Sequence, residues 1–397
     1  NRSVLTGRTQ EEIAANLPSP AAGASAVDPA SIAGAARAPM PAALTPMMAS
    51  LADTFPSGGN WLYEIKWDGV RALCFIENGA MYILTRNGNR CERQYPELDV
   101  LPHRVRAVNA ILDGEIAVLD PQGRPRFSLI QPRIAQTDPN AVAHLARSTP
   151  ATLFAFDLIY LDGFDLRGAA LADRKQALRA VLQTDDRIRV SDHFEATGPE
   201  MLEAARQAGL EGVVAKRADS KYETRRVTTW LKFKAHSEQE FVICGFTHGE
   251  REYFSSLVLG VYEGGALKHA GQVGTGFDDK TIRAIYQRLQ PLITTKSPFR
   301  AKARALRQIT WVEPKLVCQV RFVEWTQDGQ LRAPSFQGLR EDVDPAAVVR
   351  ETGGAAPDDA PAPQPPKSDL IPPGPKELTL EVGAQKLRFT NLNNIGV

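Results

Sequence analysis

The sequence of 397 residues is poor in cysteine and contains no long apolar run. Its four cysteines and six histidines are scattered, and no C-x-x-C pair occurs. This spacing excludes a disulfide scaffold and argues against a structural zinc site, which needs closely spaced ligands. No stretch of about 18 uncharged apolar residues is present, so we predict no membrane-spanning helix and no membrane partner. We expect a protein of a reducing compartment, the cytoplasm.

The chain also lacks an excess of charge of either sign. Lys and Arg number 47 and Asp and Glu number 46, which excludes a uniformly basic nucleic-acid-binding coat. One segment departs from this balance, because residues 281–340 contain eleven Lys or Arg and three Asp or Glu. Such a local excess favours contact with a phosphate backbone, although a solvated surface is the alternative.

Low-complexity segments flank the centre of the chain. Residues 1–43 and 346–376 are rich in Ala, Pro and Gly, a composition typical of linkers. Because the chain opens at Asn1 rather than Met, we expect a fragment of a longer protein, with 1–43 following an earlier module. Two strand-like runs around Gly383 predict that residues 377–397 begin a further module.

Residues 44–236 are rich in short alternating strands, which favours antiparallel sheets. Turn signals separate the strands, and Asp113-Gly114 is one of them. Two flanking helices are predicted, at 171–183 and at 199–208.

Residues 237–345 form a second candidate domain. They contain about five strands and one amphipathic helix, from about Asp278 to Leu289. This content fits a small barrel of the OB type. The expected fold class of the whole chain is α+β.

One short string combines an acid, a lysine and a turn. Residues 64–71 read E-I-K-W-D-G-V-R, and strand alternation places Glu64 and Lys66 on one face and Ile65 on the other. A lysine at a strand end followed by Asp-Gly holds its amine on rigid backbone. Taken alone, Lys66 is explained equally well as a surface lysine with a packed aliphatic stem.

Four later strings accompany this one: L-D-G-E at 112–115, F-A-F-D at 154–157, E-G-V-V-A-K at 211–216 and W-L-K-F-K at 230–234. The last string puts Lys232 and Lys234 on one strand face. Two adjacent ammonium groups repel each other, so the pair favours a bound anion such as phosphate. A solvated strand edge protected by lysines is the alternative.

Together these residues favour nucleotidyl transfer. A nucleophilic lysine must be neutral, and we expect neighbouring cations and partial burial to lower the pKa of Lys66. A nucleoside triphosphate supplies the electrophile, and the paired lysines hold its phosphates. Glu115 and Glu211 are hard oxygen ligands that suit Mg²⁺, which also neutralises the departing pyrophosphate.

In order and spacing, the strings resemble the motifs of the covalent nucleotidyltransferases, and among them those of the ATP-dependent DNA ligases. K-W-D-G at 66–69 is similar to the nucleotidyl-lysine motif, and L-T-R-N-G at 84–88 to the arginine motif that follows it. The resemblance implies an adenylation (nucleotidyltransferase) domain followed by an OB-fold domain. It also implies ATP and Mg²⁺ or Mn²⁺ as cofactors, and nicked or broken duplex DNA as substrate.

The resemblance assigns five residues to the nucleotide. Lys66 would carry the AMP, and Glu64 would contact the amino group of adenine, with Ile65 beside it. Arg71 would hold ribose or phosphate. Phe156 would stack on the base.

Five further residues are assigned to phosphates and metal. Glu115 would hold ribose or phosphate and, with Glu211, bind the metal ion. Lys232 and Lys234 would meet the α-phosphate. Arg86 would lie toward the nucleotide or the phosphate of the nick.

The run G-L-R-E-D at 338–342 resembles the last motif of the family, whose Arg340 would reach the triphosphate. The family usually ends this run with lysine, where this chain has Val343. Two alternatives stay open: an RNA ligase or GTP-using capping guanylyltransferase of the same superfamily, and a non-catalytic DNA-binding scaffold. Val343 is the only support for the scaffold.

Within this family, the chain more closely resembles the ligase module of the bacterial multi-domain end-joining ligases, the ligase D group. G-Q-V-G-T-G-F at 271–277 and L-R-A-P-S-F-Q-G-L-R-E-D at 331–342 carry this similarity. It implies non-homologous end joining on the bacterial nucleoid, with Ku as partner. The two ends of the chain would then connect to fused phosphoesterase and polymerase modules.

Overall fold

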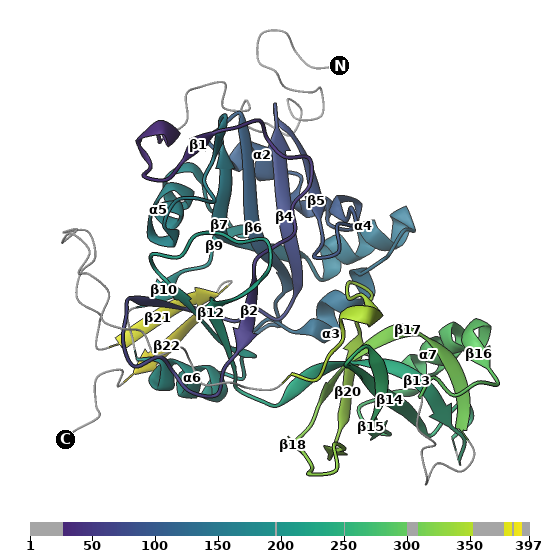
Figure 1. The fold of residues 1–397 in the computed structure, drawn as a ribbon. Helices are drawn as coiled ribbons and strands as arrows, with labels where there is room; N and C mark the ends of the chain where they lie inside the picture. Colours follow the sequence, from purple (N-terminus) through teal and green to yellow (C-terminus); the bar gives the residue numbers. More distant parts are fainter. Residues whose placement is uncertain are drawn as a thin grey trace. The chain divides into compact units, whose positions relative to one another are not determined.

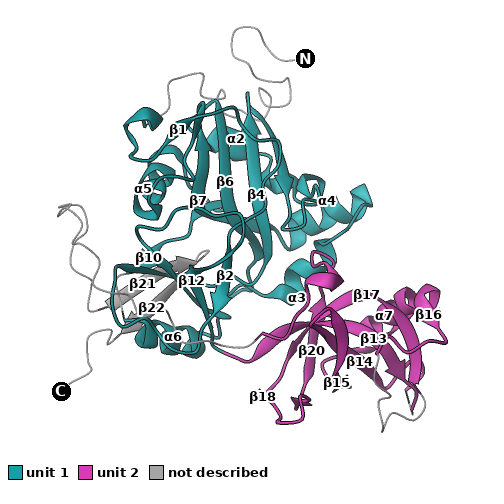
Figure 2. Ribbon diagram, viewed as in Figure 1, with its two compact units in different colours: residues 1–235, 353–397 teal, residues 236–352 magenta. Residues whose placement is uncertain are grey.

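The computed structural model describes residues 27–194, 197–249, 251–299, 309–351, 377–382 and 385–390. The chain divides into two compact units, residues 1–235 with 353–397 and residues 236–352 (Figures 1 and 2). Each unit has its own sheets and its own apolar core.

The first sheet of unit 1 has seven strands in the order β1-β8-β7-β6-β4-β5, with β9 beside β7. The strands are β1 (Ala36–Arg37), β4 (Val70–Glu77), β5 (Ala80–Leu84), β6 (Asn109–Val118), β7 (Ala151–Leu161), β8 (Phe164–Asp165) and β9 (Ile188–Val190). Only the β7–β9 pair is parallel among these. Strands β4, β6 and β7 are buried on both faces, which is why their sequences are almost continuously apolar.

The second sheet of unit 1 has the order β10-β3-β11-β12-β2. Its strands are β2 (Met48–Leu51), β3 (Trp61–Ile65), β10 (His193–Phe194), β11 (Gly212–Arg217) and β12 (Arg226–Lys234). Strand β11 pairs antiparallel with β3 and β12, whereas β2 runs parallel to β12.

The two predicted helices of unit 1 are confirmed as α5 (Leu171–Val181) and α6 (Gly198–Gln207). Helix α6 has Pro199 in its first turn, and Gly209 follows its end with a φ of 68°. Three more helices, α2 (Leu101–Arg104), α3 (Phe127–Ile130) and α4 (Pro139–Ser148), lie between β5 and β7 in the chain. Short 3-10 turns are η1 (Pro29–Ser31), η2 (Glu92–Gln94), η3 (Pro96–Leu98) and η4 (Gln131–Arg133).

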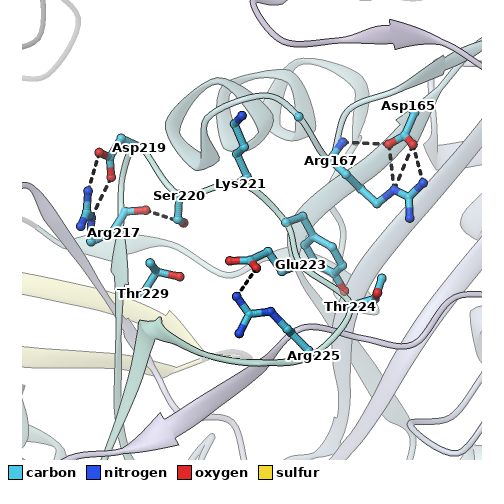
Figure 3. A pocket seen from close by; sticks show the side chains of 12 residues that line it. Asp165, Arg167, Arg217, Asp219, Ser220, Lys221, Glu223, Thr224, Arg225 and Thr229 are labelled. Atoms are coloured by element: carbon cyan, nitrogen blue, oxygen red, sulfur yellow. Dashed lines mark hydrogen bonds and ion pairs between the residues drawn. The ribbon is translucent and has the colours of Figure 1, made fainter. Parts of the chain in front are cut away.

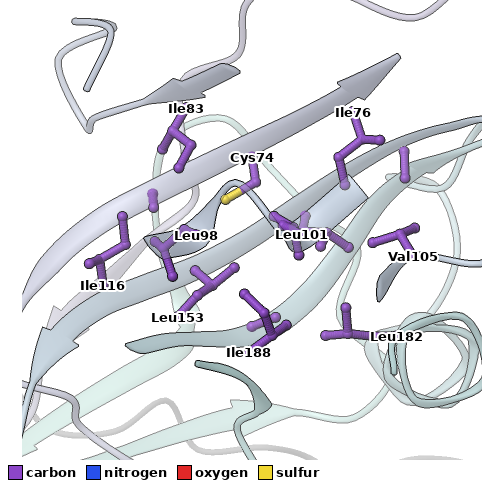
Figure 4. Packing of buried hydrophobic residues seen from close by; sticks show 14 of the residues in the cluster. Cys74, Ile76, Ile83, Leu98, Leu101, Val105, Ile116, Leu153, Leu182 and Ile188 are labelled. Carbon is purple, nitrogen blue, oxygen red and sulfur yellow. The ribbon is translucent and has the colours of Figure 1, made fainter. Parts of the chain in front are cut away.

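Apolar clusters hold the layers of unit 1 together. The largest packs one face of the first sheet against the connecting helices, and includes Cys74, Leu98 and Leu153 (Figure 4). A second cluster combines residues of both sheets, among them Phe75 and Trp230. Residues 36–37, within the segment expected to be a linker, form β1 and pair with β8, so part of 1–43 joins this fold.

The expected turn at Asp113-Gly114 is wrong. Both residues lie inside β6, where the pairing with β7 shifts register. A Cβ at residue 114 would come within 2.8 Å of the Phe154 carbonyl oxygen, so the glycine is needed for the close approach of β7 rather than for a turn.

Unit 2 contains one sheet in the order β15-β14-β13-β17-β16, with β20 beside β17, and a small β18–β19 hairpin. The elements are β13 (Glu238–Thr247), β14 (Ser256–Glu263), β15 (Ala266–Val273), α7 (Asp279–Leu289), η5 (Gln290–Leu292), β16 (Ile293–Thr294), β17 (Ile309–Arg321), β18 (Glu324–Trp325), β19 (Leu331–Arg332), β20 (Ser335–Leu339) and η6 (Pro345–Ala347). Helix α7 is capped by the Asp278 carboxylate, which accepts from the Thr281 amide (2.7 Å), and it buries Ile282 and Ile285 in the barrel core.

The two strand-like runs near the end of the chain form the antiparallel pair β21 (Glu377–Val382) and β22 (Gln385–Thr390). None of the helices in the described ranges has the length and apolar character needed to span a lipid bilayer.

Candidate active site

The acid and the lysines of the sequence motifs gather on one face of the second sheet. Glu64 on β3 and Lys232 on β12 lie opposite the same residue of β11, and Lys234 lies opposite Gly212. The Lys66 amide donates to the Gly212 carbonyl (3.0 Å), so Lys66 and Lys234 flank Gly212 in one row across the sheet. Because directly paired residues project from the same face of a sheet, this register agrees with the predicted alternation.

The opposite face of the same sheet is apolar. Ile65 is 4% exposed and belongs to a cluster with Phe233 and with Met201 and Ala205 of α6. The side chain of Ile65 therefore faces away from the lysines.

Two motif glycines allow close backbone approach. A Cβ on Gly69 would lie 2.2 Å from the Ile116 carbonyl oxygen, and one on Gly212 would lie 2.0 Å from that of Phe233. No other residue fits these positions without displacing the neighbouring strand. The K-W-D-G and E-G strings thus bring Lys66 and Glu211 to a tightly packed strand end.

Lys66 is surrounded by carboxylates. Its ammonium group bonds to Glu211, with side chains 22% and 11% exposed. Burial by itself would lower the pKa of Lys66, but Glu211, followed by Asp68 and Glu115, outweighs burial and the pKa is raised. The expectation that cations lower this pKa is therefore wrong for the ligand-free protein, because the nearest charges are acids: Glu211 directly before β11, Asp68 two residues along the chain, and Glu115 on β6.

Arg71 is held by a buried acid. Its guanidinium donates to both Asp113 oxygens (2.6 and 2.7 Å), and the Tyr222 hydroxyl donates to the same carboxylate (2.6 Å). Burial opposes the positive charge, yet Asp113 raises the pKa of Arg71 above its usual value. The guanidinium also lies 4.7 Å from the ring centroid of Phe156, and Arg71 pairs directly with Glu115 across β4 and β6. Neither Asp113 nor Tyr222 was predicted from the sequence as a site residue.

Glu64 is buried at 2% exposure among two lysines and a serine. Lys175 donates to Oε1 (2.8 Å), whereas Lys216 (3.0 Å) and Ser191 (3.2 Å) donate to Oε2. Burial would raise the pKa of Glu64, but Lys175 and then Lys216 lower it, so the carboxylate is ionised. The Lys216 ammonium also lies 4.0 Å from the ring centroid of Phe156.

Lys175 is a residue that sequence reasoning missed although a signal existed. Leu171, Arg174, Lys175, Leu178 and Val181 share one face of α5, and all five are buried. Two cations on an apolar helix face need acidic partners. Arg174 pairs with Asp157 (2.8 Å), with both side chains 0% exposed, and Lys175 pairs with Glu64.

The remaining predicted residues of unit 1 lie on or near strands: Lys234 ends β12, Lys232 and Glu115 lie inside β12 and β6, and Arg86 follows β5. Lys232, Lys234 and Glu115 are partly buried. Arg86 is partly buried in a turn after β5, which the Thr85 amide closes by donating to the Asn89 carbonyl (2.9 Å).

Arg340 belongs to unit 2. Its guanidinium donates to both oxygens of Asp342 (2.8 and 2.7 Å) and lies 3.7 Å from Glu240. Val343 is 4% exposed and packs in the apolar core of this unit. The position where the family usually has lysine therefore serves barrel packing here.

The basic segment 281–340 is only partly described, because Arg300, Lys302, Arg304 and Arg307 lie outside the described residues. Several of its described cations have acidic partners, including Arg288 with Glu341, Arg321 with Glu238 and Arg332 with Glu324.

Comparison with known proteins identifies the chain. Residues 39–234 match the ATP dependent DNA ligase domain, and residues 250–343 match the ATP dependent DNA ligase C terminal region. A solved structure of mycobacterial DNA ligase D complexed with ATP and MES is 36% identical, with a TM-score of 0.54, over 78% of this chain and 98% of that one. The chain belongs to the ATP-dependent DNA ligase family. The predicted fold, an adenylation domain and an OB-fold domain, is confirmed.

Curated relatives agree with this membership. The ligase is 36% identical over 330 residues to the multifunctional non-homologous end joining protein LigD of Pseudomonas aeruginosa, and 38% identical over 297 residues to that of Mycobacterium bovis. These matches cover 81% and 73% of this chain but 38% and 37% of the relatives. The ligase thus spans about two fifths of their length.

The acids around Lys66 fit a metal ion shared with substrate. Among the described residues, no group of three or more His, Cys, Asp or Glu is arranged to hold a metal by itself. Mg²⁺ is usually bound by one or two carboxylates together with substrate phosphates. Glu211 and Glu115, which both act on the charge of Lys66, are oxygen donors of that kind.

A hollow of about 900 Å³ lies elsewhere in unit 1 and is lined by the β11–β12 loop and the turn after β8 (Figure 3). Its arginines are already paired with acids two residues away, as Arg167 with Asp165 and Arg225 with Glu223. None of the site residues predicted for the ligase lines it.

Proposed function

We propose that this chain seals 3′-hydroxyl/5′-phosphate breaks in duplex DNA through an AMP bound covalently to Lys66. The observation that carries the proposal is the position of Lys66, at the end of β3, bonded to Glu211 and in one row with Lys234. A fixed amine among acids and lysines suits an attack on a bound phosphoanhydride.

The reaction takes place in three steps. The Lys66 amine loses a proton and attacks the α-phosphorus of ATP, so a P–N bond forms and pyrophosphate leaves. A 5′-phosphate oxygen of the DNA then attacks the same phosphorus, which breaks the P–N bond and yields adenylated DNA. Finally the 3′-hydroxyl attacks the activated 5′-phosphate, a phosphodiester forms and AMP leaves.

The other site residues take the positions that the family resemblance assigns. Glu64 receives the amino group of adenine, and Phe156 stacks on the base. Arg71 and Glu115 hold ribose or phosphate. The cationic face of the second sheet stabilises charge on the phosphates.

Lys232 and Lys234 supply that cationic face. Arg86 lies toward the nucleotide or the nick, and Arg340 meets the triphosphate in the first step. Glu211 and Glu115 hold Mg²⁺ or Mn²⁺, which when bound neutralises charge on the triphosphate and on pyrophosphate.

The cellular role proposed is double-strand break repair by non-homologous end joining on the bacterial nucleoid. The LigD relatives support this role, since their names include end joining. Ku is the proposed partner. Residues 1–43 and 377–397 are proposed to connect to phosphoesterase and polymerase modules, with a linker at 346–376.

The test is covalent labelling followed by transfer. The protein is incubated with α-labelled ATP or GTP, and then with nicked duplex DNA or nicked RNA. We expect an ATP-derived adduct that is transferred to DNA, no adduct in Lys66→Arg, and a normal adduct in Lys221→Ala, whose lysine is exposed and lies off this sheet face. Labelling by GTP alone would indicate a capping guanylyltransferase, transfer to RNA alone an RNA ligase, and a folded protein without adduct a scaffold.

A further inference from the structure

Helix α5 supplies a cation that holds three separate parts of unit 1. The Lys175 ammonium donates to Glu64 Oε1 on β3 (2.8 Å), to the Phe156 carbonyl on β7 (3.3 Å) and to the Ser191 carbonyl (3.1 Å). An ammonium has three N–H donors, so every donor of Lys175 is used. The side chain is 1% exposed. Lys175 therefore connects Glu64 to the backbone of Phe156 at fixed distances.

The Glu64 carboxylate is almost saturated. Its two oxygens offer about four acceptor positions, and the donors Lys175, Lys216 and Ser191 take three of them. Among the described residues this leaves one acceptor position, on Oε1, the oxygen that Lys175 holds. Ser191 is itself fixed, because its hydroxyl accepts from the indole N–H of Trp67 (2.9 Å).

The two lysines at Glu64 differ in how firmly they are held. Lys216 donates to Glu64 and otherwise lies over the rings of Phe156 (4.0 Å) and Trp230 (4.2 Å). Burial, aided by the charge of Lys175 and opposed by Glu64, lowers the pKa of Lys216 to about 8. Among the described residues, Lys216 has one hydrogen-bond acceptor whereas Lys175 has three, so Lys175 fixes the orientation of the Glu64 carboxylate more firmly.

We propose that Lys175 is a positioning residue that orients Glu64 toward the exocyclic amine of the purine and thereby sets the preference for ATP. This inference rests on the proposed function, in which Glu64 receives the adenine amine. A carboxylate oxygen accepts from an N–H donor and repels the carbonyl that guanine has at the same position. Without Lys175, the carboxylate loses its Oε1 anchor, and its orientation toward the base is lost.

The experiment compares ATP with purine riboside triphosphate, which lacks the 6-amino group, and with GTP. For each nucleotide, the second-order rate constant of adduct formation on the full chain is measured. In Lys175→Met we expect the ATP to purine riboside triphosphate ratio to fall about tenfold or more, since a hydrogen bond to a charged group is lost. Lys175→Arg keeps the charge and should retain most of the ratio.

Sealing of a nick pre-activated with purine riboside monophosphate separates positioning from a general structural role, because that substrate offers Glu64 no amino group. We expect Lys175→Met to seal this DNA within about twofold of the wild type, like the control Arg179→Met on the exposed side of the same helix, whose side chain is 44% exposed. If Lys175→Met fails to fold, Lys175→Gln replaces it, because glutamine removes the charge and keeps an N–H donor. The ATP to purine riboside triphosphate ratio is then measured for Lys175→Gln and should fall in the same direction.

Two results would overturn the inference. One is an unchanged nucleotide ratio in the variant, and the other is a loss in sealing of the pre-activated nick as large as the loss in adduct formation with ATP. Both are distinct from a failure of the proposed function, in which the wild type itself forms no adduct with ATP.

Discussion

Two lysine–carboxylate pairs in unit 1 have the same chemistry and different surroundings. Lys66 and Glu211 lie at a strand end with side chains 22% and 11% exposed, whereas Lys175 and Glu64 are 1% and 2% exposed. In the buried pair, the Lys175 ammonium has two additional acceptors, the carbonyls of Phe156 and Ser191. An ion pair that must break during a reaction needs the partly exposed environment of Lys66 and Glu211. An ion pair that fixes the orientation of a side chain needs the buried environment of Lys175 and Glu64.

The contrast extends along α5. Arg174 pairs with Asp157 in complete burial and also donates to the Ala169 (2.6 Å) and Ser220 (2.9 Å) carbonyls. Such pairs add little net stability when both partners are present, because desolvation offsets attraction. Removal of one partner is costly, because the other charge is left buried and unpaired.

The largest effect on stability is expected from Arg174→Met. The variant leaves the Asp157 carboxyl group buried without its cationic partner, so the free energy of unfolding should fall by about 3–5 kcal/mol. Urea unfolding of the full chain measures the loss. Arg179→Met, on the exposed side of the same helix, should change the free energy by less than about 0.5 kcal/mol. A loss below about 1 kcal/mol in Arg174→Met would mean that the buried pairs are not fixed.

For Glu211→Gln we expect a large loss of activity and little loss of stability. Since the Lys66–Glu211 pair is partly exposed, the free energy of unfolding should change by less than about 1 kcal/mol. Self-adenylation should fall about 100-fold, because one of the two proposed carboxylate ligands of the metal ion is lost. Glu203→Gln serves as the control, because Glu203 on α6 pairs with the exposed Arg206 away from Lys66. Full labelling activity in Glu211→Gln would remove Glu211 from the reaction.

The sequence predicted features that depend on local periodicity. The period of two placed Glu64 and Lys66 on one face of β3, and Lys232 and Lys234 on one face of β12. That both pairs lie on the same face of the sheet depends on the pairing of β3 and β12 with β11, which the period does not give. The ends of α6 followed from Pro199 and Gly209 in the same way.

Features that depend on distant partners were not predicted. The raised pKa of Lys66 comes mainly from Glu211, 145 residues away in the chain, and Lys175 meets Glu64 across 111 residues. Asp113-Gly114 was interpreted as a turn because that dipeptide is a strong local turn signal. In the fold, the same residues hold Arg71 and admit a neighbouring strand. The charged residues on the apolar face of α5 were the one unused sequence signal.

A smaller effect is expected on the pH dependence of self-adenylation. Because the neutral amine is the nucleophile and carboxylates raise the pKa of Lys66, the rate at saturating ATP should rise with pH through the neutral and mildly alkaline range. Asp68→Asn removes one of these charges and keeps an acceptor for the Phe127 amide (3.1 Å). Its profile should move to lower pH by less than about one unit. A shift toward higher pH in Asp68→Asn would contradict this account of Lys66.

The smallest effect concerns His193, which pairs with Glu64 across β10 and β3. Burial, then the charges of Lys175 and Arg179, lower the pKa of His193 to about 4. The folded protein therefore keeps this ring neutral while the unfolded chain binds a proton below about 6.5, so stability falls as the pH drops from 6.5 toward 4. Lys175→Met should raise the pKa of His193 in an NMR titration, and Lys66→Met should leave it unchanged. Equal shifts of the His193 pKa in the two variants would show that Lys175 and Lys66 act equally on His193, and would contradict the difference between the two pairs.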